Sequence, residues 1–230
     1  MIENRFTPQM LDFLAENHIR NSKEWYDAHK DTCRSLVTEP FHQLVEQMAP
    51  TMLAIDPAFV VQPSRCLSRV RRDTRFTKNK DLYRDHMWIT FRHPKKRLGE
   101  SLCYYFGVNQ DSWSYGVGYY DMPRTVLAEC QQMILHEDRS FQEAFRALNN
   151  SRFALYGQDY KRPKFPEAPE QYQSWLNKKW FEVHFASDDF DQLFGGEFYA
   201  PMIRDIQQIA PMYHFLRRAE ELVRRNTQGK

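Results

Sequence analysis

The feature that most constrains the fold is a run of alternating stretches enclosed between two groups of helical patterns. Helical patterns precede this run and follow it. Strands joined by short connections between groups of helices are typical of an α+β domain. We therefore expect an α+β fold with an antiparallel or mixed central sheet, whose N-terminal and C-terminal helices pack mainly on one side. Alternation of apolar and polar side chains predicts the strands at residues 65–70, 86–92, 102–108 and 113–120.

The helical patterns before the strands begin at recognisable capping residues. Thr7 and Pro8 predict the start of a first helix, because proline at the first helical position loses no hydrogen bond. A second helix is expected over residues 22–37, and Pro40 marks the start of a third. The chain is therefore expected to enter the sheet after three helices.

Punctuating residues also divide the second half of the chain. Pro123 and Asp138 predict two helix starts. A helical pattern over residues 198–225 is expected to break at Pro211, because proline cannot continue a helix. Two further short strands and one more helix are expected at residues 153–156, 180–186 and 171–179.

Length and composition favour one folded domain spanning residues 1–230, with a weak possible boundary at the proline-containing stretch 163–169. Hydrophobic residues make up 42% of the chain, which excludes a disordered protein and allows a core without metal or disulfide support. The four cysteines include no CxxC pair and are expected as thiols in a reducing compartment. Neither a secretory signal nor an apolar run of about 18 residues is visible, so we expect a cytoplasmic protein without membrane contact.

Charge is concentrated between Arg65 and Asp85, a stretch that we call the basic segment. It carries six arginines and two lysines against three aspartates, a net charge of +5 in a chain of formal net charge +2. The planar guanidinium group suits two-point contact with a carboxylate or a phosphate. The basic segment therefore predicts a site for a phosphorylated or carboxylated small molecule. Its candidate anion-binding residues are Arg69, Arg72, Arg75, Lys78, Lys80 and Arg84.

Two other groups of residues are candidates to assist this site. Lys161 and Arg162 form a second cationic motif, which could close over the same anion. A carboxylate among many cations ionises readily, which suits ion pairing or a general-base role. The candidates to orient the arginines or to exchange protons are Glu24, Asp73 and Tyr83, with Asp85 and His86 as further acid–base residues.

Two alternative interpretations of the basic segment stay open. Its charges could bond only to one another, as Asp73 with Arg72 and Arg75 would, in a purely structural salt-bridged loop. The segment could also be part of a single-stranded nucleic-acid or protein-binding module, beside a hairpin that carries stacking tyrosines. Tyrosines on a sheet are more often core residues than stacking platforms. The tyrosines concerned are Tyr104, Tyr105, Tyr119 and Tyr120.

Common catalytic and cofactor motifs are missing from the sequence. No two histidines have metal-ligand spacing, and neither a GxGxxG fingerprint nor a Walker lysine motif is present, so no metal and no cofactor are expected. Cys66 lies near arginines, but its expected inward position favours a buried structural thiol over a nucleophile. Gly116 and Gly118 share one expected strand, which predicts a bulge or the close approach of a ligand or another backbone. The sequence leaves open whether the protein is an enzyme.

Several of these motifs together resemble a bacterial and fungal family known only as a domain of unknown function, number two-four-six-one. RVRRDTRFTKNKDLYRDH, which runs from Arg69 to His86, is similar to the most specific motif of that family. Weaker similarities, in the family's order over nearly the whole chain, are carried by FTPQMLDFLAEN with NSKEWYDAHK, by GVGYYDMP, and by YGQDYKRP with LNKKW. Cys33, Asn79 and Leu82 depart from residues common in the family, which puts any role of those positions in doubt. The resemblance implies a single conserved module and no particular activity, substrate or cofactor.

Overall fold

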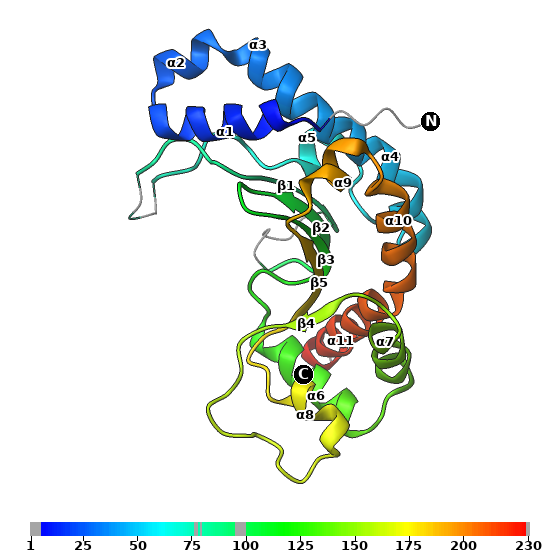
Figure 1. Ribbon diagram of the computed structural model, residues 1–230. Helices are drawn as coiled ribbons and strands as arrows, with labels where there is room; N and C mark the ends of the chain where they lie inside the picture. Colours follow the sequence, from blue (N-terminus) through cyan, green and yellow to red (C-terminus); the bar gives the residue numbers. More distant parts are fainter. Residues whose placement is uncertain (1–5, 76–77, 79, 95–99, 229–230) are drawn as a thin grey trace. The chain divides into compact units, whose positions relative to one another are not determined.

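The computed structural model describes residues 6–75, 78, 80–94 and 100–228, and Figure 1 labels its helices and strands. Within these residues the strands form one five-stranded antiparallel open sheet of order β1-β2-β3-β5-β4. Together with the helices this gives an α+β fold, which confirms the predicted class. The strands are β1 Met87–Arg92, β2 Cys103–Val108, β3 Trp113–Gly118, β4 Ala154–Tyr156 and β5 Glu182–Ser187.

Contacts within the chain divide it into two compact units, each built from three separate segments. Strands β1, β2, β3 and β5 contribute residues to both units. The stretch 163–169, expected as a weak boundary, lies inside the second unit, and a single domain stays a prediction. The first unit comprises residues 1–91, 105–115 and 186–203, and the second comprises residues 92–104, 116–185 and 204–230.

The first helix starts at the predicted residue. Helix α1 spans Pro8–Arg20, and Asn21 ends it in the left-handed conformation, with φ 47°. The helix expected over residues 22–37 is divided instead, because His29 Nδ1 donates to the carbonyl oxygen of Trp25 (2.7 Å) and its backbone leaves the helical range. The observed pieces are α2 Lys23–Ala28, α3 Lys30–Cys33 and the π-helix η1 Arg34–Thr38, followed by α4 Glu39–Ile55.

Residues 65–70, all of which are described, do not form the predicted strand. Helix α5 spans Pro63–Cys66 instead, because proline at its first position favours a helical turn. The Cys66 Sγ atom closes the turn by donating to the carbonyl oxygen of Val60 (3.2 Å), and this thiol is 3% exposed. Leu67 keeps one element of the expected pairing, an isolated antiparallel bridge to Ile89.

The helices after β3 begin near the predicted residues. Asp138 caps α7, since its Oδ1 accepts a hydrogen bond from the Ser140 backbone N–H (2.8 Å). The break expected at Pro211 falls at Ile209, and helix α9 was not expected from the sequence. None of the described helices is both long enough and apolar enough to span a membrane. These helices are α6 Arg124–Leu135, α7 Arg139–Asn149, α8 Glu170–Leu176, α9 Phe190–Gly195, α10 Tyr199–Gln208 and α11 Ala210–Gln228.

Each unit has an aromatic core made from residues that are distant in the sequence. In the first unit the ring of Phe6 lies 5.0 Å from the ring of Phe41. In the second unit the ring of Phe141 lies 5.4 Å from Trp175 and 5.6 Å from Phe215. Both cores therefore depend on long-range contacts, and neither is the product of a single helix pair.

Two glycines in β3 allow β5 to approach closely. A methyl group at Gly116 would overlap the backbone of Val183, and one at Gly118 would overlap Glu182. The sequence predicted a bulge or the close approach of a ligand or another backbone at these positions, and the close approach of a backbone is confirmed. On its other side β5 pairs antiparallel with β4, with Leu155 opposite Val183.

Candidate anion-binding site

The basic segment folds back on itself as an irregular hairpin within the first unit. Its two sides are joined by backbone hydrogen bonds from Arg72 N–H to the Leu82 carbonyl (2.8 Å) and from Arg84 N–H to the Val70 carbonyl (3.1 Å). The pairing brings arginines that are twelve or more positions apart in the sequence to the base of one hairpin. Arg75, Lys78 and Lys80 lie toward its tip, and Arg65 precedes the hairpin in α5.

Buried contacts fix the base of this hairpin to the end of α1. The Asn21 Oδ1 accepts a hydrogen bond from the Leu82 backbone N–H (2.6 Å), and His18 Nδ1 donates to the Tyr83 carbonyl (2.9 Å). The Tyr83 side chain is 0% exposed and stacks on Tyr26, with 4.8 Å between ring centroids. Burial raises the pKa of Tyr83, so its hydroxyl stays protonated at neutral pH. The buried Tyr83 ring therefore anchors the basic segment to α2.

Arg84 occupies the base of the hairpin. Its Nη1 donates to the carbonyl oxygens of Arg69 (2.5 Å) and Arg71 (3.2 Å), and its Cζ lies 5.0 Å from the centre of the Trp88 ring. Burial lowers the pKa of Arg84, and the neighbouring positive charge of Arg72 lowers it further. Among the described residues no carboxylate forms an ion pair with Arg84. A half-buried guanidinium beside a like charge is an arrangement that a bound anion would stabilise.

The tip of the hairpin holds an exposed ion pair. Asp73 accepts hydrogen bonds from Arg75 Nε (2.9 Å) and Nη2 (2.7 Å), and these side chains are 56% and 76% exposed. The guanidinium of Arg75 lowers the pKa of Asp73 to about 2. Lys80 Nζ donates to the Thr74 carbonyl (2.9 Å). Because ion pairs at the surface contribute little stability, this contact supports the structural interpretation only at the tip.

The other predicted cations of the segment are less engaged. Arg72 Nη1 lies 3.9 Å from Asp81 Oδ2, at the limit of an ion pair, and not next to Asp73 as the sequence suggested. Arg69 and Lys78 are exposed and form no ion pair with any residue that the structure describes. The same holds for Arg71, which the sequence did not single out. Positive charge therefore exceeds its local compensation at the hairpin base.

A carboxylate–imidazole pair follows the hairpin directly. His86 Nδ1 donates to Asp85 Oδ1 (2.7 Å), and the two side chains are 47% and 45% exposed. This hydrogen bond lowers the pKa of Asp85. The imidazole stacks on Trp88, with ring centroids 5.4 Å apart. The acid–base candidates at the end of the basic segment thus lie beside the ring that Arg84 covers.

Glu24 has a local structural role. Its carboxylate accepts a hydrogen bond from the Ser22 hydroxyl (2.8 Å) at the start of α2. Hydrogen bonds from its own backbone and from Ser22 lower the pKa of Glu24. In the described part of the chain Glu24 contacts no arginine of the basic segment. No direct contact therefore supports a role of Glu24 in orienting these arginines.

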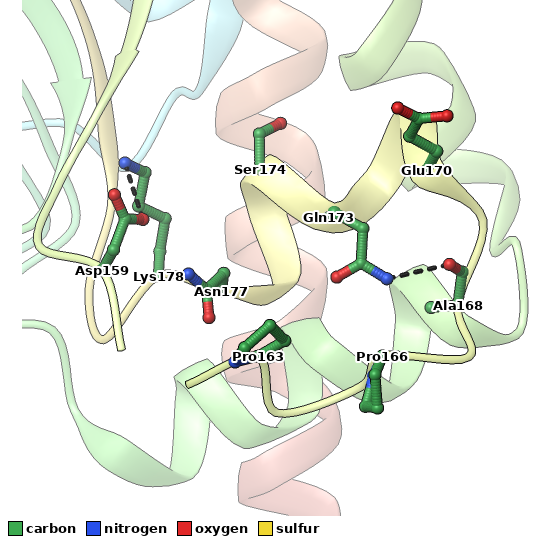
Figure 2. A pocket seen from close by; sticks show the side chains of 9 residues that line it. All are labelled: Asp159, Pro163, Pro166, Ala168, Glu170, Gln173, Ser174, Asn177 and Lys178. Carbon is green, nitrogen blue, oxygen red and sulfur yellow. Dashed lines mark hydrogen bonds and ion pairs between the residues drawn. The ribbon is translucent and has the colours of Figure 1, made fainter. Parts of the chain in front are cut away.

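Lys161 and Arg162 belong to the second unit, where they lie exposed on the loop before α8. A pocket lies between this loop and α8, and Figure 2 shows the side chains that line it. Its volume is about 620 Å³. Neither of the two cations lines it. We call this cavity the α8 pocket. It is lined by Asp159, Pro163, Pro166, Ala168, Glu170, Gln173, Ser174, Asn177 and Lys178.

The polar groups of the α8 pocket are mostly used to hold the loop. Gln173 Nε2 donates to the Ala168 carbonyl (2.8 Å), and Lys178 Nζ forms an ion pair with Asp159 Oδ1 (3.0 Å), as Figure 2 shows. The Asn177 Nδ2 donates to the backbone outside the pocket, while its Oδ1 is buried without a donor among the described residues. The pocket is therefore lined by proline rings and hydrogen-bond acceptors more than by free cations.

The tyrosines of the β2–β3 hairpin are largely core residues. Tyr104 and Tyr119 are 1% and 0% exposed, and Tyr104 stacks on Tyr213 with 5.7 Å between ring centroids. Tyr120, in contrast, is 89% exposed. Two of the four rings proposed as a stacking platform are thus inaccessible to a nucleic acid. Within the described residues, no group of three or more His, Cys, Asp or Glu side chains could hold a metal ion.

The fold and this hairpin define an α+β protein with an arginine-rich loop anchored to its first helices. The sequence model of the conserved hypothetical protein family DUF2461 matches residues 9–215, so the chain belongs to this family. The match contains the whole basic segment and parts of both units. No curated protein matches the chain.

Sequence reasoning missed the residues that hold the hairpin in place. Asn21 and His18 were not singled out from the sequence, although a side chain at a helix end often caps a neighbouring backbone. Trp88 could have been found, because it alternates with His86 on one expected strand. Gln110, which donates to the carbonyls of Leu11 and Asp85 (3.2 Å each), left no signal in the sequence.

Proposed function

We propose that the protein binds a phosphorylated or carboxylated small molecule at the base of the basic segment, with Arg72 and Arg84 as the central contacts. The observation that supports this most is the state of Arg84. Its guanidinium is immobilised by two backbone carbonyls, lies beside Arg72, and has no carboxylate partner among the described residues. An anion between the two guanidinium groups would offset their repulsion and accept charge-assisted hydrogen bonds.

The anchoring of the hairpin supports the same proposal. Tyr83 is fully buried and Leu82 is hydrogen-bonded to Asn21, so the base of the hairpin is fixed before any ligand arrives. A site that is already ordered loses little conformational entropy on binding. Arg69 and Lys78, exposed toward the solvent, would add longer-range attraction. The proposal needs residues of the first unit alone.

A thermal-shift screen tests this proposal. The panel contains phosphate, pyrophosphate, citrate, mononucleotides and a short oligonucleotide, each at low and high salt. A ligand at about a hundred times its dissociation constant adds about 2.7 kcal/mol, which raises Tm by roughly 5–10 °C for a chain of this size. We expect such a rise for at least one small anion.

Variants separate a specific site from general charge. Arg72→Gln and Arg84→Gln should each abolish the rise, whereas Arg204→Gln should keep it, because Arg204 is an exposed arginine on α10. The Arg72 variant carries the test if loss of Arg84 unfolds the hairpin. An unchanged response in the Arg72 variant, or a panel without any stabilising anion, would overturn the proposal. Stabilisation by the oligonucleotide alone, weakening steeply with salt, would favour a phosphate clamp for single strands instead.

A further inference from the structure

The Asp85–His86 pair is not used by the proposed binding function, yet it has the form of an acid–base group. Because Asp85 Oδ1 lies 2.7 Å from His86 Nδ1, that nitrogen carries the hydrogen of the neutral ring. Nε2 is then the lone-pair nitrogen, which can accept a proton. Both side chains are close to half exposed, so a ligand can reach them.

The pair is next to the central arginine of the proposed anion site. The Trp88 ring stacks on the imidazole of His86, with an interplanar angle of 18°, and its centre lies 5.0 Å from Arg84 Cζ. One tryptophan ring is thus the common neighbour of the imidazole and the guanidinium.

Hydrogen bonds from three parts of the first unit hold this arrangement. Trp88 exchanges hydrogen bonds with Ser68, whose N–H donates to the Trp88 carbonyl (2.9 Å) and whose Oγ accepts from the Trp88 N–H (3.1 Å). Gln110 Nε2 donates to the Asp85 carbonyl (3.2 Å) and also to the carbonyl of Leu11 in α1 (3.2 Å). The strand, the β2–β3 turn and the first helix together fix where the imidazole lies.

We infer that His86 is the acid–base residue of the proposed anion site and contacts the bound oxyanion through Nε2, with Asp85 as its positioning residue. This inference rests on the proposed function. It narrows the substrate class to phosphorylated or carboxylated compounds that carry a hydroxyl group or are attacked by water. In the step concerned, Nε2 takes the proton of that O–H, and the bonding electron pair stays on the oxygen. Asp85 stabilises the resulting imidazolium. As the oxygen forms its new bond to the substrate and the bond to the leaving group breaks, the imidazolium gives its proton to the leaving oxygen.

Other charged groups near the pair set the background for this step. Arg84 shares the Trp88 ring with the imidazole. His18 of α1, which is bonded to the Tyr83 carbonyl, adds to the lowering of the pKa of Asp85 that the hydrogen bond from His86 causes. A bound anion close to the imidazole would favour its protonated form.

Isothermal titration calorimetry with sulfate tests the inference. Sulfate has no proton to exchange near neutral pH, so any proton that moves on binding belongs to the protein. Heats measured in buffers of different ionisation enthalpy give the number of protons taken up. We expect wild-type protein to take up a fraction of a proton when sulfate binds. His86→Gln should still bind sulfate but without proton uptake, and Asp85→Asn should bind sulfate with an altered uptake.

Controls separate the possible failures. His136→Gln, which replaces an exposed histidine of the second unit, should bind sulfate and take up protons as wild type does. Arg72→Gln should lose sulfate binding altogether. Equal proton uptake in wild type and His86→Gln would overturn the role of His86 and leave the anion site intact. Absence of sulfate binding to wild type, together with a flat thermal-shift panel, would overturn both proposals.

Discussion

The basic segment and the loop before α8 are both rich in cations, but the cations of the two regions have different partners. In the basic segment, Arg84 is immobilised by backbone carbonyls beside Arg72 and lacks a carboxylate partner among the described residues. Near α8, Lys164 donates to Gln131 Oε1 (2.7 Å) and Lys178 pairs with Asp159 (3.0 Å). The first arrangement leaves a fixed guanidinium without a carboxylate partner, whereas these two lysines near α8 each have a hydrogen-bond or ion-pair partner.

The number of cations in a stretch therefore does not by itself define an anion site. What matters is whether a cation is both fixed in place and short of local acceptors. Lys161 and Arg162 are exposed, form no hydrogen bond or ion pair with the described residues that would fix them, and do not line the α8 pocket, so they fail the first condition.

The largest loss of stability is expected at the buried tyrosine of the basic segment. Tyr83→Ala should destabilise the protein by about 3–5 kcal/mol, because it removes a fully buried ring that stacks on Tyr26. Tyr156→Ala in β4 should cost at most about 1 kcal/mol, because Tyr156 is 52% exposed. Tyr83→Phe should be close to neutral, since the hydroxyl has no described partner. Urea unfolding measures all three, and equal losses in the two alanine variants would contradict the difference in anchoring.

A smaller effect separates the lysines of the loop before α8. Lys164→Ala should destabilise by about 1–3 kcal/mol, because the Oε1 of Gln131, a residue only 1% exposed, loses its donor. Lys161→Ala is the matched control and should stay within about 0.5 kcal/mol of wild type, because Lys161 is exposed and has no described partner. Urea unfolding measures the free energy of unfolding of both variants. Equal losses of stability in the two variants would contradict the role given to the hydrogen bond from Lys164 to Gln131.

The smallest effect is a pH dependence at the tip of the basic segment. Arg75 lowers the pKa of Asp73 from 3.8 to about 2, so the carboxylate stabilises the folded state above pH 3.8 and loses this contribution as pH falls toward 2. The effect on unfolding should be small because both side chains are exposed. A carbon NMR titration should show the low midpoint, and Arg75→Gln should move it upward. A midpoint near 4 in wild type would contradict the ion pair.

The parts of the fold that sequence reasoning predicted well are those fixed by local signals. The alternation of Met87, Ile89 and Phe91 gives β1, and Asp138 caps its helix as expected. The strand expected at residues 65–70 fails, because the same alternation fits an extended stretch and a helical turn opened by Pro63. Local alternation cannot choose between these without the rest of the fold.

The candidate site was less predictable than the fold for a related reason. Asp73 has Arg72 and Arg75 as near neighbours in the sequence, and only the shape of the turn decides that Arg75 is the partner. The contact that fixes Leu82 comes from Asn21, and the one that occupies Lys164 comes from Gln131. Contacts between residues so far apart follow from tertiary structure, and residue spacing carries no record of them.

The interleaving of the two units has a consequence for how this protein can change during evolution. Each unit is assembled from three stretches that alternate along the chain, and four strands supply residues to both. No single cut of the gene can therefore release either unit as an intact piece, and no simple fusion can transfer one of them to another protein. Recombination has to inherit the two units together or lose both.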